Sequence, residues 1–251
     1  MKLQNNSVLL DTSIIEDKFS DRVLICERNG KYIYKTDKPD LVVQEFRTNG
    51  TADKNPEMEK LDTLRNEISS YLFEYLDGFH IPTHFVTRLS DIEMSVRRTE
   101  LIPIAVKVFN IVNGALGKRL GLKDNIQTEL PIIEHYYING QKNGSWINEH
   151  HVYALSLATP EEFKQMNRIA TKANAVLRGL CDRRQLILAE TQFEFGRFKN
   201  QIVLINEISP LTCHFLDLTS DNKAKRDRFL IDNEGAADAI SQLRDRLLLR
   251  G

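Results

Sequence analysis

The pattern of hydrophobic and polar positions predicts three short strands before the first helix. Val23–Cys26 and Lys31–Tyr34 are apolar runs that flank Asn29-Gly30, a strong signal for a two-residue hairpin turn. Leu41–Phe46 is a third run, and it follows a break at Pro39. We therefore expect an antiparallel meander. Lys31 lies just past its first turn, within reach of a phosphate, although a solvated strand lysine is the ordinary interpretation.

Three helices follow from capping signals and from apolar residues at three- and four-residue spacing. One begins at Pro56, which stands at a first helical position after the N-cap candidate Asn55, and it ends at Asp77-Gly78. A second begins at the capping box Thr159-Pro160-Glu161-Glu162 and continues to about Leu180. Ala236–Leu249 is amphipathic and predicts a terminal helix.

Between the helices the pattern predicts further strands and irregular segments. Phe85–Leu89, Met94–Arg98 and Ala105–Phe109 have the composition of strands. Thr99–Pro103 joins the last two and is a candidate hinge between two lobes. We expect residues 122–158 to be mostly irregular, and residues 221–228 to form a polar surface loop.

A hairpin with acidic groups is the strongest candidate for a site. Leu186–Phe195 and Ile202–Ile208 are apolar runs with turn residues between them. Alternation along a strand places Glu190, Gln192 and Glu194 on one face. Only one residue of Asn206-Glu207 can face the same side, and the spacing leaves open which. Oxygen ligands on a rigid sheet suit Mg²⁺ with nucleotide phosphates. An amphipathic hairpin with one solvated face is the alternative.

Two other motifs give weaker signals. Asn110–Gly121 is punctuated by glycines and ends in a basic pair, but it lacks the spacing of a phosphate-binding loop. His80 and His84 have the spacing of a helical metal pair, and Pro82 between them disfavours the helix that would align them.

The composition of the chain limits which cellular compartment and which kinds of binding partner we expect. The chain has 251 residues, 41% of them hydrophobic and 27% charged, which is enough to bury a core in one large domain or two lobes. A net charge of −1 predicts neither a nucleic-acid nor a membrane partner. Three widely spaced cysteines without a Cys-x-x-Cys pair fit a reducing compartment. We expect a cytoplasmic protein without a disulfide framework.

From about Val23 to Phe229 the chain resembles the SAICAR synthetase family. Several stretches carry the resemblance, and their order and spacing are kept: Gly30–Tyr34, His80–Thr83, Asn110–Gly121, Lys172–Asn174, Leu186–Leu188, Phe193–Gly196, Glu207–Pro210 and Asp227–Phe229. The resemblance implies an α+β fold with two lobes and a nucleotide cleft between them. It assigns residues 1–102 to an N-terminal antiparallel-sheet lobe and residues 103–251 to a larger α+β lobe with the acidic hairpin and the substrate site.

The resemblance also implies a reaction. Members of the family are ATP-dependent ligases of purine biosynthesis that join the carboxylate CAIR to L-aspartate with ATP and Mg²⁺. A small-molecule carboxylate and an amine would therefore be the substrates, and a homodimer is an option that the sequence leaves open.

Carried onto this chain, the resemblance gives roles to particular residues. Lys31 and Glu194 would be catalytic. Glu190, Glu194 and Glu207 would hold the metal. Nucleotide binding would fall to Lys31, Arg97, Thr99, Glu100, Leu101 and Ile102, and substrate binding to Asn113, Lys118, Arg119 and His214.

The chain departs from the family pattern where the family does its chemistry. Asn29 replaces the first of two lysines, Asn206 a metal-binding aspartate and Gln192 a lysine. Four apolar residues replace polar or charged groups of the acid-substrate site: Phe109, Ile111, Ala115 and Leu211. Two hypotheses follow. One is a ligase redirected to another acid, which the intact scaffold favours. The other is a non-catalytic paralogue that binds a nucleotide or a protein partner, which the loss of a metal ligand favours and the retention of Lys31 and Glu194 opposes.

Overall fold

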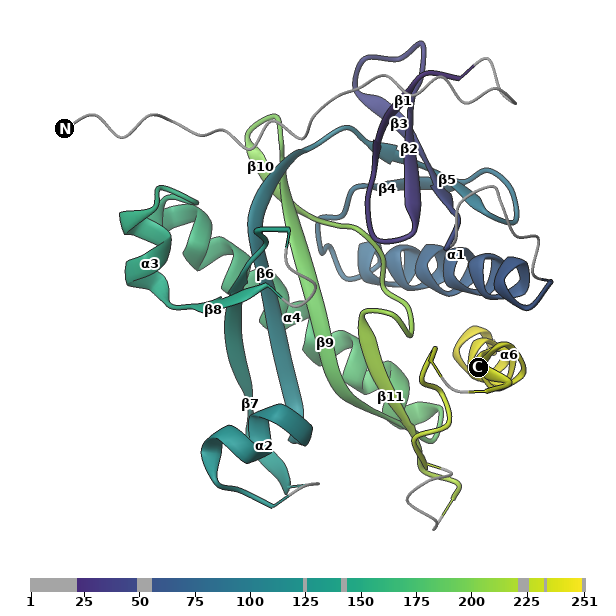
Figure 1. Cartoon of the computed structure of the whole chain (residues 1–251), viewed down its shortest axis with the longest axis vertical. Helices are drawn as coiled ribbons and strands as arrows, with labels where there is room; N and C mark the ends of the chain where they lie inside the picture. Colours follow the sequence, from purple (N-terminus) through teal and green to yellow (C-terminus); the bar gives the residue numbers. More distant parts are fainter. Residues whose placement is uncertain are drawn as a thin grey trace.

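The structure is a computed structural model that describes residues 22–48, 56–123, 126–140, 144–220, 226–232 and 234–249. Two antiparallel sheets with helices packed on them make up the described part (Figure 1). The predicted α+β class is therefore confirmed. The N-cap candidate Asn55 and most of the predicted polar loop at 221–228 lie outside the described residues.

The first sheet has five strands in the order β1-β2-β3-β5-β4. Its strands are β1 (Leu24–Glu27), β2 (Lys31–Lys35), β3 (Leu41–Phe46), β4 (Phe85–Arg88) and β5 (Glu93–Arg97). The predicted turn is present: Asn29 and Gly30 have φ of 51° and 65°, and the backbone N–H of Arg28 donates to the carbonyl of Lys31 at 2.8 Å. Asn-Gly suits this turn because both central residues need positive φ.

The second sheet has six strands in the order β10-β9-β6-β7-β8, with β11 paired to β9. Its strands are β6 (Glu100–Val112), β7 (Ile126–Tyr137), β8 (Ser145–Ile147), β9 (Leu186–Phe198), β10 (Gln201–Ile205) and β11 (Cys213–Asp217). The predicted acidic hairpin is β9 and β10, which are antiparallel with Glu194 opposite Ile205.

Two expectations about this sheet are wrong. Residues 122–158 are not mostly irregular, because β7, β8 and a short helix lie there. Strand β7 is held by pairing along β6, a contact between strands that local sequence does not reveal. Thr99–Pro103 is not a separate connection either, because β6 begins at Glu100 and runs through Pro103. Its register against β9 shifts between Ile102 and Ala105, beside a proline that has no N–H to donate.

Several helices accompany the sheets in the described residues, among them α1 (Pro56–Asp77), α2 (Gly114–Leu120), α3 (Glu149–Ala154), α4 (Pro160–Arg183) and α6 (Ala236–Leu248). The predicted capping box of α4 is confirmed: Glu162 N–H donates to Thr159 Oγ1 at 3.2 Å, and Thr159 N–H to Glu162 Oε2 at 2.9 Å. Among the described helices none is long and apolar enough to cross a membrane.

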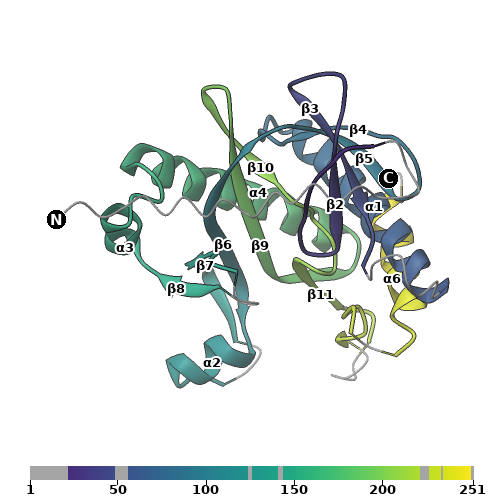
Figure 2. The same cartoon turned by 45° about the horizontal axis from the view of Figure 1, so that its top comes forward.

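The helices connect the two sheets through one large core. Helix α4 packs against β9 and β6, whereas α1 packs against β3, β4 and β5. Helix α6 returns from the C-terminal end of the chain to lie beside α1, as both ribbon views show (Figures 1 and 2). The largest cluster of buried hydrophobic residues contains members from both sheets and from α1, α4 and α6. Cys26, Cys181 and Cys213 are free, as predicted.

The predicted boundary between residues 102 and 103 lies close to the junction of the sheets. Strand β5 ends at Arg97 and β6 begins at Glu100. An isolated parallel bridge between Thr83 and Leu204 also joins the segment before β4 to β10. The two sheets thus separate between Arg97 and Glu100. Helix α6, although it comes from the C-terminal part of the chain, packs against α1. The division at 102 stays a prediction.

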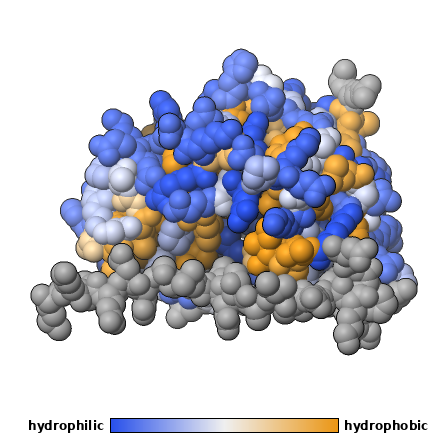
Figure 3. Space-filling view, turned by 90° about the horizontal axis from the view of Figure 1, so that it is seen from above, coloured by the Kyte–Doolittle hydropathy of each residue, from blue (hydrophilic) through white to orange (hydrophobic). Residues whose placement is uncertain are grey.

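The face of the molecule seen from above is mainly hydrophilic (Figure 3). Apolar patches are present on it, but polar and charged residues separate them. Scattered apolar side chains are ordinary on protein surfaces, so this face gives no argument for a protein partner. The homodimer stays a prediction.

Gly196 of β9 marks a close approach of β10 and of the connection between β5 and β6. A Cβ atom added there would lie 2.7 Å from Cβ and Oγ1 of Thr99 and 3.1 Å from Cγ2 of Ile205. We expect Gly196→Ala to lower the free energy of unfolding by about 1–3 kcal/mol, because overpacking forces neighbouring atoms to move. Urea unfolding measures this. Gly179→Ala, in the middle of α4, meets only an ordinary contact with Arg183 at 3.6 Å and should be neutral or stabilising. Equal stability of the two variants would contradict the prediction.

Candidate active site

The acidic face of β9 meets the first hairpin of the other sheet. Phe193 and Phe195 belong to the main core, so alternation places Glu190, Gln192 and Glu194 on the opposite face of β9. Glu194 is only 3% exposed, and its Oε2 lies 2.8 Å from Nη2 of Arg28, just before the β1–β2 turn. The described residues give this Oε2 atom no partner with hydrogen-bond geometry, so the contact is an ion pair.

Glu207 is the centre of a buried ion cluster. It contacts Nζ of Lys31, and it receives two hydrogen bonds from Arg65, at 2.7 Å from Nη2 and 3.1 Å from Nε. The hydroxyl of Ser209 donates to its Oε2 at 2.6 Å. Arg65 also donates to Asp62 at 2.9 Å. These contacts join β2 of the first sheet and helix α1 to the segment after β10.

The electrostatics of this cluster favour a charged Glu207. Burial alone would raise its pKa, but the charges and hydrogen bonds of Lys31 and Arg65 outweigh burial and lower the pKa to about 2. Burial lowers the pKa of Lys31, against the opposing attraction of Glu207. For Arg65 the attraction of Glu207 and Asp62 outweighs burial, and the pKa is raised. Glu207 is therefore an anion that neutralises two buried cations.

The three carboxylates predicted to hold a metal are each paired with cations. Glu194 faces Arg28, Glu207 faces Lys31 and Arg65, and Glu190 lies 3.4 Å from Nζ of Lys107. Within the described ranges no three His, Cys, Asp or Glu side chains are grouped so that they could hold a metal ion. As they lie, these residues do not fit Mg²⁺, which takes oxygen ligands that are free to coordinate it.

The predicted nucleotide residues lie together at the junction of β5 and β6. Arg97 ends β5 and donates to the carbonyl of Thr83 at 2.5 Å. Glu100 begins β6 and accepts from Arg197 at 3.0 Å. Thr99 is packed against Gly196, and Leu101 and Ile102 are the next residues of β6, with Ile102 fully buried. The structure thus brings this segment next to the end of β9. Lys31 lies on the other sheet.

The predicted substrate residues fall into two places. Asn113 is the N-cap residue of α2, and Lys118 and Arg119 are in the last turn of that helix. Arg119 is paired with Glu134 on β7. His214 lies on β11 directly opposite Glu190 of β9, and it contacts Asp227. Lys118 is exposed, and it has no side-chain partner among the residues described.

Comparison with known proteins identifies the family. The family model described as SAICAR synthetase matches residues 25–241. The chain belongs to the SAICAR synthetase family. A relative from Persephonella marina, named phosphoribosylaminoimidazole-succinocarboxamide synthase, is 39% identical over 84% of this chain and 90% of its own. One from Prosthecochloris aestuarii with the same name is 38% identical over 90% and 97%.

Solved structures agree with this assignment. A phosphoribosylaminoimidazole-succinocarboxamide synthase from Ehrlichia chaffeensis has a TM-score of 0.80 and 27% identity, and the match covers 91% of this chain and 99% of that one. A SAICAR synthetase in complex with ADP has a TM-score of 0.79 and 30% identity, covering 89% and 97%. The predicted SAICAR synthetase fold is thereby confirmed.

Two of the four apolar substitutions in this SAICAR synthetase family member are packed inside the protein. Phe109 is 7% exposed and packs with Val112, Leu116 and Ile132. Ile111, also 7% exposed, packs with three other residues: Ala189, Leu216 and Ile187. Ala115 and Leu211 are exposed. None of the four side chains offers a hydrogen bond or a charge to a ligand.

Sequence reasoning missed Arg28, Arg65 and Lys107, the cations that pair with the acidic groups. A signal was present for Arg65, because it stands inside the buried stripe of α1 between Leu64 and Ile68, where a charged residue needs a partner. For Arg28 and Lys107 nothing in the local sequence indicates a partner on β9.

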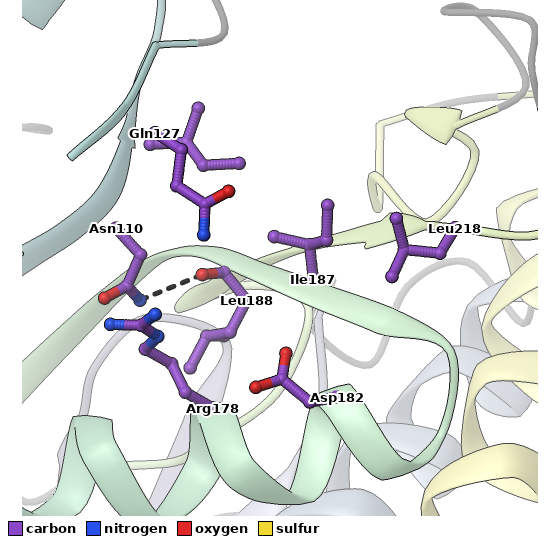
Figure 4. A pocket seen from close by; sticks show the side chains of 8 residues that line it. Asn110, Gln127, Arg178, Asp182, Ile187, Leu188 and Leu218 are labelled. Carbon is purple, nitrogen blue, oxygen red and sulfur yellow. Dashed lines mark hydrogen bonds between the residues drawn. The ribbon is translucent and has the colours of Figure 1, made fainter. Parts of the chain in front are cut away.

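A cavity of about 200 Å³ opens at the end of the large sheet, where β6 and β9 meet α4 (Figure 4). Arg178 and Asp182 rise from α4, and Asn110 donates to the carbonyl of Leu188 at 2.9 Å. The remaining lining residues are Ile111, Gln127, Ile187 and Leu218. Ile111 connects this cavity to the apolar cluster of the substituted substrate site.

His84 is buried at the junction of the two sheets rather than in a metal site. Its ring packs edge-on against Phe73 at 5.3 Å, and its backbone N–H donates to Leu204 at 2.8 Å. Burial lowers its pKa to about 3, so the imidazole is neutral in the folded protein. In the unfolded chain the same imidazole accepts a proton near pH 6.5.

This difference predicts a pH dependence of stability. Between pH 6.5 and about 3 the unfolded state binds more protons at His84, so folding stability falls as the pH drops through this window. We expect a loss of about 2 kcal/mol by pH 5, since each pKa unit corresponds to about 1.4 kcal/mol. Urea unfolding should show that the free energy of unfolding falls less between pH 7.5 and pH 5 in His84→Phe than in the wild type. His150→Phe, on exposed α3, should keep the wild-type difference. An equal loss in His84→Phe would contradict the assignment.

Proposed function

We propose that the protein is an ATP-dependent carboxylate–amine ligase of the SAICAR synthetase type whose acid substrate differs from CAIR. The observation that carries the proposal is the apolar packing of Phe109 and Ile111 within an intact family scaffold. A cytoplasmic enzyme of small-molecule metabolism fits this proposal.

Nucleotide binding is supported by retained residues and by a relative. Lys31 is buried and contacts Glu207, and Glu100, Leu101 and Ile102 pair with the end of β9. The SAICAR synthetase structure that contains ADP has the same fold. We therefore propose ATP as the cosubstrate, with the segment Thr99–Ile102 against the adenine and Lys31 near the phosphates.

The reaction would proceed in two steps. A carboxylate oxygen of the acid attacks the γ-phosphorus of ATP, which releases ADP and leaves an acyl phosphate. The amine then attacks the acyl carbon, and phosphate leaves as the amide forms. Lys31 would offset negative charge on the phosphoryl group in transit. Mg²⁺ is a usual companion of ATP, but the proposal assigns it no ligand, because Glu190, Glu194 and Glu207 are paired with cations.

The acid site favours a substrate that is less anionic than a sugar phosphate with a carboxylate. Around the substituted positions, Arg119 is paired with Glu134, so its charge is already compensated, and the ring of His214 contacts Asp227. Lys118 is the remaining predicted substrate cation, and it is exposed. We propose an acid with an apolar ring or chain against Phe109 and Ile111.

The test measures ADP formation with L-aspartate and a panel of aromatic carboxylic acids, with and without a phosphate group. Acid-dependent and amine-dependent ADP formation would support the ligase. Binding of ATP by calorimetry without ADP formation on any acid would favour the non-catalytic paralogue. Lys31→Met should weaken ATP binding about tenfold or more, because it removes a charged partner. Lys35→Met, at the exposed end of the same strand, is the matched control.

A further inference from the structure

The cavity at the end of the large sheet is formed where two strands separate. Strands β6 and β9 pair as far as Phe109 opposite Glu190. Beyond this point β6 stays paired with β7, and β9 with β11. Asn110 lies in the gap, and its Nδ2 donates to the carbonyl of Leu188 and to Oδ1 of Asn174 on α4, both at 2.9 Å. A hydrogen-bonded side chain thus fixes the strands around a cavity of about 200 Å³.

Two opposite charges of α4 face this cavity. Arg178 and Asp182 are one helical turn apart, and both side chains point from the helix toward β9 (Figure 4). Neither side chain has a hydrogen-bond or ion-pair partner among the described residues. They also do not pair with each other, and an arginine four residues before an aspartate is the less favourable order for a helical ion pair. One cation and one anion are therefore available to a ligand in the cavity.

The position of Asp182 favours a cationic partner. It lies in the last turn of α4, where the helix end is itself partially negative. Two arginines follow it, but both are directed elsewhere. Arg183 donates to the hydroxyl of Tyr75, and Arg184 donates to the carbonyl of Leu249. An ammonium group beside Asp182 would compensate this carboxylate.

The rest of the wall is mainly aliphatic, and the space is small. Ile111, Ile187, Leu188 and Leu218 line the cavity together with the amides of Asn110 and Gln127. Pockets for drug-sized ligands have volumes of about 300–1,000 Å³, so this cavity suits a smaller molecule. Such a molecule would place an apolar group against the aliphatic wall.

A small zwitterion satisfies all of these groups at once. A ligand with a single charge would leave either Arg178 or Asp182 without a partner beside it. We propose that the cavity binds an aliphatic α-amino acid, with its carboxylate on Arg178, its ammonium group on Asp182 and its side chain against Ile187 and Leu218. The guanidinium suits a carboxylate because it can donate two parallel hydrogen bonds.

This site is separate from the one proposed for ATP. At about 3.3 Å per residue, the stretch of β9 from Ile187 to Gly196, which packs against Thr99, is about 30 Å long. None of the predicted substrate residues, all of which are described, lines the cavity. The amino-acid site therefore does not depend on the proposed ligase activity.

The test is a ligand-observed nuclear magnetic resonance titration of the full chain. The probes are L-leucine, isocaproate, which lacks the amino group, and isopentylamine, which lacks the carboxylate. L-leucine should bind with a Kd of about 1 mM or lower. Each of the two analogues should bind about tenfold or more weakly, because one charge of the cavity then has no partner.

Two variants assign the ends of the ligand. Arg178→Met should weaken L-leucine binding about tenfold or more and remove its advantage over isopentylamine. Asp182→Asn should remove the advantage of L-leucine over isocaproate. Arg168→Met, at an exposed position of the same helix, is the matched control and should bind all three probes like the wild type. Urea unfolding should show wild-type stability in both site variants, because neither replaced side chain has a partner in the described residues.

Two results would overturn the proposal. One is a wild-type protein whose Kd for L-leucine exceeds about 10 mM. The other is wild-type affinity for L-leucine in Arg178→Met or in Asp182→Asn, because the amino acid would then occupy another place, such as an amine-substrate site. Neither result involves ADP formation, so this proposal and the proposed ligase can fail separately.

Discussion

Replacing Glu207 with glutamine is expected to lower the free energy of unfolding by about 3–5 kcal/mol, because breaking a buried ion pair leaves an uncompensated charge. Two cations would be affected. Lys31 is 3% exposed and Arg65 is 1% exposed, and both contact the Glu207 carboxylate. Asp62 would remain as a partner of Arg65, but Lys31 would lose the carboxylate that contacts it.

Urea unfolding at neutral pH measures this loss. Glu190→Gln is the matched control, because its side chain is 33% exposed and its ion pair with Lys107 is longer, at 3.4 Å. Glu190→Gln should lower the free energy of unfolding by at most about 1 kcal/mol. The double variant Lys31→Met/Glu207→Gln should recover part of the loss, since it removes one buried cation along with the anion. A loss below about 1 kcal/mol in Glu207→Gln would mean that the cluster is solvated in solution.

The second large effect concerns CAIR. Turnover of CAIR with L-aspartate and ATP is expected to be at least about a hundredfold below a typical enzyme rate near 10 per second. CAIR carries a phosphate and a carboxylate, and both need fixed donors or cations. Phe109, Ile111 and Leu211 offer none, and the buried pair is already packed against other apolar side chains.

The magnitude follows from hydrogen bonds to charged groups. Each lost bond costs roughly 1.5–3 kcal/mol, or about one to two powers of ten in affinity, and several losses compound without being strictly additive. An assay that couples ADP release to a spectroscopic signal measures turnover. A rate within about tenfold of 10 per second would contradict our interpretation of the substitutions.

One variant distinguishes a defect in metal binding from a defect in the acid-substrate pocket. Asn206 has φ of 76°, a left-handed conformation that aspartate also tolerates. Asn206→Asp should therefore fold. We expect it to strengthen metal binding, because it restores the carboxylate that the family pattern has at this position. It should not restore turnover of CAIR, because Phe109 and Ile111 remain. Recovery of turnover in this variant alone would place the defect at the metal rather than in the acid pocket.

The sequence by itself determined the elements whose signals are local. Asn29-Gly30 predicted the turn of the first hairpin, because few other pairs accept two positive φ values. Thr159 and Glu162 predicted the start of α4, because they satisfy each other's backbone groups within one helical turn. The acidic face of β9 followed from alternation, and the order of the motifs predicted the family.

Only the tertiary structure decided how the strands pair and which charges meet. Residues 122–158 lack a clear period, and β7 is a strand because β6 supplies its hydrogen bonds. Glu207 was predicted to be a metal ligand, yet it lies against Lys31, which is 176 positions away, and Arg65, which is 142 away. Such contacts depend on the packing of whole sheets and helices, and no local pattern encodes them. The same holds for Arg28, whose partner Glu194 belongs to the other sheet.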